Sequence, residues 1–450
     1  MYTRFISRFL FPLQEHLKRH TTVAVHKHME KTQWWPWAQL RELQVQRLRE
    51  LLLSANAHVP YYRTLFARLQ FDPAKVDTPE ALRVLPFLDK ELIRAHTAEL
   101  KAENARTLAP FNTGGSSGEP LTFYIGQRVS HDVAAKWRAT RWWGVDIGDA
   151  EIVLWGSPIE LGAQDRLRVI RDKLLRSTLL PAFEMSEIKM DAFVSAIERI
   201  KPRMLFGYPS SLALLAKHAK DRGRRLDHLG IKVAFVTAER LYEDQKAIIT
   251  DVFACPVANG YGARDAGFIA HECPQGKMHI TAEDVIIEII DNEGNVLPPG
   301  KLGEIVVTHL ATADFPFIRY RTGDMGILDD VLCTCGRGLP LLKEVEGRAT
   351  DFVVAANGTV MHGLALIYPL RAENTIRAFK IIQESLLKTR VQIVPGEGWD
   401  VPAQQRIAQA FHARLGNEVR VDFELMDAIP AEKSGKFRYV MSHVSPVEKR

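Results

Sequence analysis

Residues 113–118 combine glycines with hydroxyl side chains directly before the apolar run LTFYI at 121–125. The segment consists of Thr113, Gly114, Gly115, Ser116, Ser117 and Gly118. Glycine lets backbone N–H groups approach an anion closely, and the hydroxyls add further donors, so this loop could hold phosphate oxygens. It is not the P-loop of NTPases, because GxxxxGK followed by Ser or Thr is absent. Taken alone, such a segment is more often an ordinary loop.

A second group of residues has the chemistry of a metal site. HECPQGKMHI (271–280) and VLCTCGRG (331–338) supply Cys273, His279, Cys333 and Cys335. Three thiolates and one imidazole match a closed tetrahedral zinc site, whose role would be structural because no coordination position stays open. His271 is a competing ligand, and a set of free or buried thiols is the alternative. The fourth cysteine, Cys255, lies in an apolar run before Pro256 and is expected in the core.

The elements that must position these residues follow from the apolar pattern. Short β-like runs occur at 152–156, 233–239, 284–290 and 304–310, separated by helical stretches at 191–200 and 211–222. This alternation predicts an α/β domain. A long amphipathic helix is expected from Trp34 to His58, ending before Pro60. The turn formers between the last two runs predict a surface hairpin connection.

The last hundred residues have a different pattern. RVQIV, a helical stretch AQQRIAQAFHARL and a second strand EVRVDFELM follow one another before a polar tail. We expect a compact α+β domain there. The predicted division is 1–346 for a large N-terminal domain and 347–450 for a small C-terminal domain.

Composition excludes several classes of protein. The 450-residue chain carries 59 Lys plus Arg against 54 Asp plus Glu, a net charge of +5 that is too small and dispersed to favour nucleic acid as a partner. Four cysteines and no export signal argue against a disulfide framework and for a reducing cytoplasm. No apolar run reaches the roughly 18 residues that a membrane span requires. The composition leaves open whether the protein forms a homodimer.

The first residues suggest an amphipathic helix. Apolar side chains recur at helical spacing beside basic ones, which would suit peripheral contact with a membrane surface. The apolar set is Phe5, Ile6, Phe9, Leu10, Leu13 and Leu17, and the basic set is Arg4, Arg8, Lys18 and Arg19. We prefer the simpler interpretation, a helix that docks this stripe on its own domain, because such stripes usually mark a core face.

Six segments in fixed order resemble the motifs of adenylate-forming acyl-CoA synthetases. They are TGGSSGEP (113–120), TAERL (237–241), NGYGARDAG (259–267), RYRTGD (319–324), EGRATDF (346–352) and PAEKSGKFR (430–438). The resemblance spans nearly the whole chain and is closest to the branch of phenylacetate-CoA ligases and CapK-like proteins of polysaccharide gene clusters. It implies a large N-terminal α/β domain of several subdomains, a small mobile C-terminal domain, and an active site between them.

The resemblance also implies roles for individual residues. The loop at 113–118 would hold the β- and γ-phosphates of ATP, and Asp324 would accept hydrogen bonds from the ribose hydroxyls. Arg348 would contact ribose or phosphate, and Asp265 would hold Mg²⁺, which prefers oxygen ligands. Lys436 would act as the mobile catalytic cation that reaches the carboxylate and the α-phosphate.

Further positions complete the implied nucleotide site. Ala238 and Glu239 would border the adenine, and the NGYG segment adds Asn259, Gly260, Tyr261 and Gly262. Some relatives in this branch also carry the arrangement of three Cys and one His described above for the zinc site. Each residue alone has a simpler structural explanation, such as a turn or a surface ion pair, and it is their joint order that favours the catalytic one.

Three positions depart from the pattern of many relatives. Glu119 stands where a lysine usually ends the phosphate loop, so phosphate binding would depend more on backbone donors. Arg264 replaces a Thr or Ser before Asp265, and its guanidinium could bind the α-phosphate in a bidentate manner. Thr350 stands at the usual hinge aspartate, with Asp351 next, which leaves the hinge residue open.

Substrate and acceptor are less specified. FGYPSSLALLAKHA (206–219) would lie near the acyl pocket by resemblance, with Tyr208 and Pro209 before a helix; aromatic walls suit an aryl or apolar acid, and packing explains them equally well. CoA is the expected acceptor of the family. The alternatives are transfer to an amine or hydroxyl of a polysaccharide precursor, or a non-catalytic scaffold protein.

Overall fold

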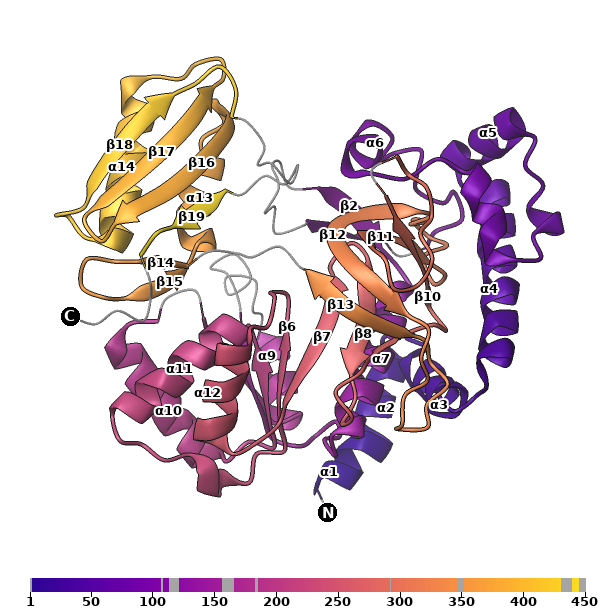
Figure 1. Ribbon diagram of the computed structural model, residues 1–450, viewed down its shortest axis with the longest axis horizontal. Helices are drawn as coiled ribbons and strands as arrows, with labels where there is room; N and C mark the ends of the chain where they lie inside the picture. The colour runs from indigo at the N-terminus through magenta and orange to yellow at the C-terminus, as the bar shows by residue number, and fades with distance from the viewer. Residues whose placement is uncertain are drawn as a thin grey trace.

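The computed structural model describes residues 2–106, 108–112, 121–155, 166–182, 185–291, 293–346, 352–429 and 439–444. Figure 1 shows a large α/β body and a smaller lobe made of β16, β17, β18 and α14. The predicted α/β class, with a separate α+β unit toward the C-terminus, is confirmed. The division at 346/347 adjoins residues outside the described ranges and stays a prediction.

The N-terminal region is helical. It contains α1 (Tyr2–Phe5), the π-helix η1 (Ile6–Leu10), α2 (Phe11–Leu17), α3 (Thr22–Thr32), α4 (Trp37–His58), α5 (Pro60–Leu69), η2 (Pro73–Lys75), η3 (Pro79–Val84) and α6 (Lys90–Ala95). The helix predicted from Trp34 begins at Trp37, because Pro36 has extended backbone angles (φ −57°, ψ 148°) and occupies the N-cap. No helix in the described part of the chain is both long and apolar enough to cross a bilayer.

The burial of the side chains in the first helical segment, residues 2–17, differs from the prediction in one respect. The segment docks on its own domain, as expected, but through Ile6 and Phe11, which are 0% and 5% exposed. Four of the six stripe residues face outward instead: Phe5, Phe9, Leu13 and Leu17 are 53–74% exposed. The interpretation of the whole stripe as a core face is therefore wrong, because the buried positions form a separate face of the same helix.

One large sheet organises the α/β body. Its described strands lie in the order β10-β11-β12-β13-β9-β8-β7-β6-β5-β3-β4. The parallel part holds β3 (Glu151–Trp155), β4 (Ser177–Pro181), β5 (Met204–Gly207), β6 (Val233–Thr237) and β7 (Val257–Ala263). The antiparallel part holds β8 (Gly267–Glu272), β9 (Met278–Ile280), β10 (Val285–Ile290), β11 (Leu302–His309), β12 (Tyr320–Asp329) and β13 (Leu341–Glu346).

Helices cover the parallel strands. They are α7 (Arg128–Trp142), α9 (Arg166–Leu174), α10 (Glu187–Ile200), α11 (Pro209–Asp221), the short η4 (Asp227–Leu229) and α12 (Glu243–Phe253). All five residues of β6, Val-Ala-Phe-Val-Thr, are buried, which is typical of a central parallel strand enclosed on both faces. The predicted runs at 152–156, 233–239, 284–290 and 304–310 are confirmed as strands β3, β6, β10 and β11 over their described residues, and β10 and β11 pair antiparallel as the predicted hairpin requires.

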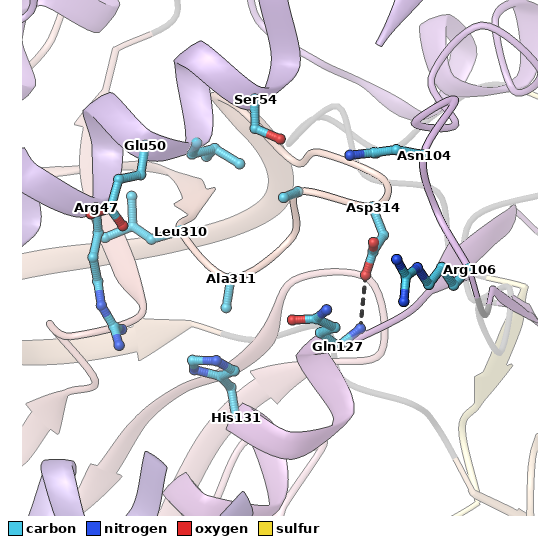
Figure 2. Close-up of a pocket in the computed structure, with 12 residues that line it drawn as sticks. Arg47, Glu50, Ser54, Asn104, Arg106, Gln127, His131, Leu310, Ala311 and Asp314 are labelled. Atoms are coloured by element: carbon cyan, nitrogen blue, oxygen red, sulfur yellow. Dashed lines mark hydrogen bonds between the residues drawn. The ribbon is translucent and has the colours of Figure 1, made fainter. Parts of the chain in front are cut away.

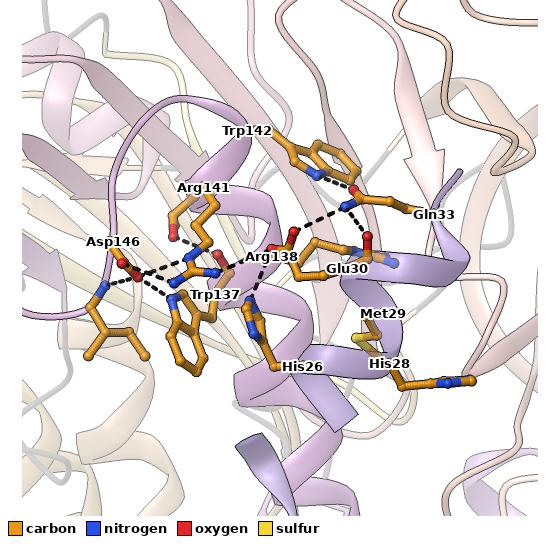
Figure 3. Close-up of polar contacts among 12 residues, drawn as sticks. His26, His28, Met29, Glu30, Gln33, Trp137, Arg138, Arg141, Trp142 and Asp146 are labelled. Atoms are coloured by element: carbon orange, nitrogen blue, oxygen red, sulfur yellow. Dashed lines mark hydrogen bonds and ion pairs between the residues drawn. The ribbon is translucent and has the colours of Figure 1, made fainter. Parts of the chain in front are cut away.

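Figure 3 shows polar contacts that join the N-terminal helix α3 to α7. The His26 ring on α3 stacks on Trp137 of α7 with centroids 3.8 Å apart. Arg138, 0% exposed, places Nη1 2.6 Å from Oε1 of Glu283, which precedes β10. The same carboxylate oxygen accepts a 2.7 Å hydrogen bond from the Thr32 hydroxyl. One buried ion pair therefore ties α3, α7 and the sheet together.

The C-terminal lobe has its own core. It contains β14 (Phe352–Val354), β15 (Val360–His362), α13 (Leu364–Arg371), β16 (Ile376–Ser385), β17 (Lys388–Pro395), α14 (Val401–Leu415), β18 (Arg420–Leu425) and β19 (Val440–Ser442). The four-stranded sheet runs β18-β17-β16-β19 and packs Phe379 and Ile381 against Phe411 of α14. Asp400 caps α14, because its side chain accepts a 2.8 Å bond from the Ala403 N–H. A backbone hydrogen bond links the lobe to the larger body, where the Met185 N–H donates to Val360 O at 3.0 Å.

Candidate functional site

Two tyrosine–carboxylate hydrogen bonds join the NGYGARDAG and RYRTGD segments. The Tyr261 hydroxyl lies 3.1 Å from Oδ2 of Asp324. The Tyr320 hydroxyl donates to Oδ2 of Asp265, whose Oδ1 accepts from the Ala266 N–H at 3.2 Å. Asp265 and Tyr320 are 6% and 0% exposed, whereas Asp324 is half-buried. The structure thus brings together two carboxylates that were predicted to serve one nucleotide.

This contact requires a strongly curved sheet. Strands β7 and β12 are separated by β8, β9 and β13, so in a flat sheet they would lie about 19 Å apart. A hydrogen bond of 3.1 Å between their side chains is possible only if the antiparallel part curls toward β7. Burial of Tyr261, with the Asp324 carboxylate beside it, raises the pKa of its phenol well above the usual value, so the phenol stays a donor at neutral pH.

Arg264 points toward the strand that leads into the Gly/Ser loop. Its Nη1 lies 3.4 Å from the carbonyl oxygen of Asn112, the last residue of β1 (Ala109–Asn112), which pairs with β2 (Thr122–Ile125). Residues 113–120 connect these two strands. Arg264 as a residue is exposed, while partial burial of its guanidinium lowers its pKa from the usual value.

A buried arginine holds the backbone of this segment. Arg128, at the start of α7 and 2% exposed, donates through Nη1 to Asp265 O at 2.6 Å and through Nη2 to Arg264 O. Its Nε lies 3.2 Å from Asp132 of the same helix. Arg128 is a positioning residue that sequence reasoning missed, because its contacts are 136 and 137 residues away.

The TAERL and NGYG segments lie side by side at the carboxyl ends of neighbouring parallel strands. Thr237 of β6 is in register with Gly260 of β7. Ala238 follows β6 with a positive φ of 73°, an uncommon angle for a residue with a Cβ, and its side chain is exposed. Glu239 accepts a hydrogen bond from the Ser210 hydroxyl. Ligands of open α/β sheets bind at such carboxyl ends, which fits the predicted adenine position.

The glycines of NGYG have structural reasons of their own. A Cβ on Gly260 would lie 2.7 Å from the Phe235 ring, and one on Gly262 would lie 2.6 Å from the Gly267 carbonyl oxygen. Both positions require glycine for packing. Asn259 lies within β7. Its backbone N–H donates to the Glu272 carboxylate at 2.9 Å, and its side chain is half-buried.

An aromatic wall stands at the ends of β3 and β5. Tyr208 stacks on Trp155 with centroids 4.2 Å apart and planes at 19°, and Trp155 also contacts Phe206. Pro209 is the first residue of α11 and fixes the direction in which the helix leaves the strand. Trp155 was not singled out from the sequence, although its place at the end of an apolar run was a usable signal.

The four predicted metal ligands converge. The ligand atoms of Cys273, His279, Cys333 and Cys335 all lie within 4.8 Å of one another. The Cys273 and Cys333 sulfurs are 3.7 Å apart, close to the roughly 3.8 Å edge of a tetrahedron with Zn–S bonds of about 2.3 Å. The Cys335 sulfur lies 3.2 Å from His279 Nε2. The donor set and its size therefore fit a zinc ion.

The surroundings of the cluster also fit a metal. His279 Nδ1 is 3.2 Å from the Leu339 carbonyl oxygen, which orients the ring and leaves Nε2 toward the thiols. Burial raises the pKa of the Cys333 thiol to about 12, so a thiolate there requires a nearby cation. His271, the competing ligand, is 0% exposed and makes a tilted ring contact with Trp142, with centroids 5.3 Å apart, outside the converging group. Cys255 is a core residue at 2% exposure, as predicted.

Several predicted site residues lie outside the described part of the chain. These are the phosphate-loop residues 113–118 with Glu119, the GR segment with Arg348 and the hinge candidates Thr350 and Asp351, and the catalytic Lys436. Their neighbours are described: Asn112 ends β1, Glu346 ends β13, and Tyr439 precedes β19. The roles assigned to these residues stay predictions.

A polar cavity of about 480 Å³ lies elsewhere in the large body (Figure 2). Arg47, Glu50 and Ser54 of α4 line one side, and Gln127, His131 and Asp314 line the other. The Gln127 N–H donates to Asp314 at 2.9 Å across its wall. Among the described residues that line it, none was predicted to bind nucleotide.

Comparison with known proteins identifies two matched regions. Residues 176–313 match the family model described as AMP-binding enzyme, and residues 353–443 match the CapK C-terminal domain. The chain thus carries an AMP-binding region followed by a CapK C-terminal domain. It is 22% identical to protein CapK of Staphylococcus aureus, over 90% of each chain. It is 25% identical to the phenylacetate-coenzyme A ligase of Thermus thermophilus, over 87% of each chain.

A solved structure shows the same fold. A 2-hydroxyisobutyryl-CoA ligase, crystallised with 2-HIB-AMP and CoA in its thioesterification state, superposes with a TM-score of 0.63 at 20% identity. The match covers 92% of this chain and 91% of that chain. The fold of this chain is therefore that of an acyl-CoA ligase. The AMP-binding enzyme model at 176–313 and the relatives named as coenzyme A ligases indicate an AMP-forming ligase.

Proposed function

We propose that this enzyme uses ATP to activate a carboxylic acid as an acyl-AMP and then transfers the acyl group to CoA. The observation that carries the proposal is the convergence of Asp265 and Asp324, held by Tyr320 and Tyr261 beside the carboxyl ends of β6 and β7. Relatives named phenylacetate-coenzyme A ligase, among them that of Pseudomonas putida at 26% identity, support CoA as the acceptor.

The reaction brings two negative groups together. The substrate carboxylate attacks the α-phosphate of ATP, and pyrophosphate leaves, so cations and N–H donors must stabilise the charge that develops. Arg264 is a cation that contacts Asn112, the residue before the Gly/Ser loop in the sequence. Asp265 would hold the Mg²⁺ that accompanies ATP, since each carboxylate oxygen retains acceptor capacity beside its present hydrogen bond.

The remaining positive charge that the reaction needs is assigned to residues Arg348 and Lys436. Lys436 would place its ammonium between the substrate carboxylate and the α-phosphate, and Arg348 would contact the ribose or phosphate. A C-terminal lobe that rotates after adenylation would remove Lys436 and admit CoA, because one set of donors cannot serve both half-reactions. The aromatic wall of Trp155, Phe206 and Tyr208 suits an aryl or apolar acid.

A pyrophosphate-release screen over a library of carboxylic acids tests this function. We expect acid-dependent release that continues over many turnovers when CoA is present. Adenylate formation that ignores CoA would indicate transfer to an amine or hydroxyl, an alternative that the CapK C-terminal domain at 353–443 favours. No acid-dependent release with any acid would refute the enzymatic proposal and leave a scaffold role.

The lysine assignment has a matched control in the same segment. Lys436→Ala should abolish adenylation while ATP binding, measured by calorimetry, stays within a few-fold of the original enzyme. Lys433→Ala, three residues earlier, should keep both. Full adenylation by the Lys436 variant would exclude the proposed role.

The Cys/His cluster holds a structural zinc ion in this proposal. Elemental analysis of protein purified without added metal should find about one zinc per chain. Cys333→Ser should lower the zinc content and the melting temperature together, whereas Cys255→Ser should leave the zinc content unchanged because that thiol lies in a separate core cluster. Well-folded protein free of metal would contradict the assignment.

A further inference from the structure

The helical N-terminus is fixed to the body along one face. Ile6 and Phe11 pack against Trp137, and Phe11 meets that indole edge-on with centroids 5.3 Å apart. The Thr3 hydroxyl donates to Asp149 at 2.8 Å. The glycine at position 148 leaves room for Ile6, because a Cβ on residue 148 would lie 2.6 Å from the isoleucine side chain. The orientation of this helix, residues 2–17, is therefore determined by tertiary contacts.

The opposite face carries an exposed apolar stripe. Phe5, Phe9, Leu13 and Leu17 are 53%, 65%, 55% and 74% exposed and repeat every four residues. In an α-helix each such step turns about 40° past a full turn. The π-helical segment Ile6–Leu10 holds more residues per turn and counteracts this drift. Four large apolar side chains thus stay on one side of the helix.

A second helix extends the stripe. The Tyr2 hydroxyl donates to the Leu174 carbonyl oxygen at 2.8 Å, which places the end of α9 beside the start of α1. Ile170 and Leu174 of α9 are 56% and 43% exposed, and Tyr2 itself is 44% exposed. We call the set of Tyr2, Phe5, Phe9, Leu13, Leu17, Ile170 and Leu174 the N-terminal apolar face.

The exposed Arg and Lys side chains of the same helical segment give it a positive charge. They are Arg4, Arg8, Lys18 and Arg19, of which Lys18 lies 3.5 Å from Glu15. The acidic residue of the segment 2–20 is Glu15, which is 3% exposed and bonded to the Thr22 hydroxyl at 2.5 Å. The solvent-facing charge of the helix is therefore cationic. Apolar side chains flanked by arginine and lysine are complementary to a surface that is apolar inside and anionic outside.

We propose that the N-terminal apolar face binds the surface of an anionic phospholipid membrane, with α1, η1 and α2 lying in the plane of the interface. A second copy of the chain fits less well, since a two-fold contact through this face would place two cationic helical segments against each other. Figure 1 shows α1 and α2 at the end of the molecule away from β16, β17 and β18, so a bound membrane would leave the C-terminal lobe free. The contact does not depend on the proposed reaction.

Vesicle flotation of the full-length protein, without substrates, tests the contact. The probe is phosphatidylcholine vesicles with and without about one third phosphatidylglycerol. We expect binding to the anionic vesicles that weakens as salt is raised. Replacing Phe5, Phe9 and Leu13 together by serine should lower the binding constant at least about tenfold, because the buried apolar area disappears.

Two further variants separate the causes. Arg4→Gln with Arg8→Gln should weaken binding to anionic vesicles about tenfold or more while leaving the apolar face intact. Ile188→Ser, at a side chain that is 83% exposed on α10, should bind like the original protein. An unchanged circular dichroism spectrum and melting temperature show that each variant is folded.

Three outcomes would overturn the proposal. The first is no binding of the original protein to anionic vesicles at low salt. The second is equal binding by the triple serine variant. The third is a dimer in sedimentation velocity that the triple variant converts to a monomer, which would make a second copy the occupant of the face.

Discussion

Replacing Tyr320 by phenylalanine removes one hydroxyl and nothing else from the candidate site. The ring is 0% exposed and packs edge-on against Phe317 with centroids 5.2 Å apart, so phenylalanine fills the same space. The lost hydrogen bond ends on the buried carboxylate of Asp265. Hydrogen bonds to charged groups contribute about 1.5–3 kcal/mol, and among the described residues Ala266 would remain as a donor to the Asp265 carboxylate.

This free energy predicts the size of the kinetic effect. If the bond orients Asp265 for the metal and phosphates, kcat/KM for ATP in acid-dependent pyrophosphate release should fall about 10- to 150-fold. Tyr261→Phe should act more weakly and chiefly on KM for ATP, because its partner Asp324 is half-buried and assigned to the ribose. Tyr61→Phe, on α5, serves as the control. Unchanged kcat/KM in a folded Tyr320 variant would refute the orienting role.

Two further predictions concern stability. Burial lowers the pKa of His309 to about 3 in the folded protein, whereas the same side chain in the unfolded chain takes up a proton near pH 6.5. The free energy of unfolding should therefore fall by up to about 1.4 kcal/mol for each pH unit below 6.5, because the unfolded state binds the extra proton. His309→Asn keeps an acceptor for the Ala311 N–H and should flatten this slope in urea unfolding, and an unaltered slope would exclude His309 as its source. Arg138→Met should destabilise by about 3–5 kcal/mol, because it leaves Glu283 charged and 0% exposed. Adding Glu283→Leu should recover most of that loss, and a loss below about 1 kcal/mol for the single variant would contradict the account.

The parallel half of the sheet was the more predictable half. Runs such as VAFVT at 233–237 are apolar throughout and separated by helical segments, so both their type and their bounds follow from local pattern. Strand β12 was not predicted as a strand. Its sequence, YRTGDMGILD, contains two glycines and three charged residues, and it is extended because β11 and β13 pair with it on both sides. Long-range pairing of this kind leaves no local signal.

In the candidate site, too, some residues could be predicted from the sequence and others could not. Motif order pointed to Asp265 and Asp324, and the spacing of CxC with a distant Cys and His pointed to Cys333 and its partners. The groups that hold these residues were missed. Tyr320 reaches Asp265 across 55 residues of sequence, and Arg128 reaches it across 137. Such supporting contacts depend on how the sheet curls, and no pattern within one segment encodes that curvature.

The N-terminal helix shows a related limit of periodicity. A 3.6-residue pattern reveals that a helix has an apolar side, but not which partner that side faces. Here two apolar faces coexist, since Ile6 and Phe11 are buried while Phe9 and Leu17 are 65% and 74% exposed. The buried face satisfies the requirement for a core contact, so the exposed one needs another explanation. Because α9, from a distant part of the chain, continues that face, the surface to be explained is larger than one helix. The proposed membrane contact would account for both its apolar character and the basic residues of the helix.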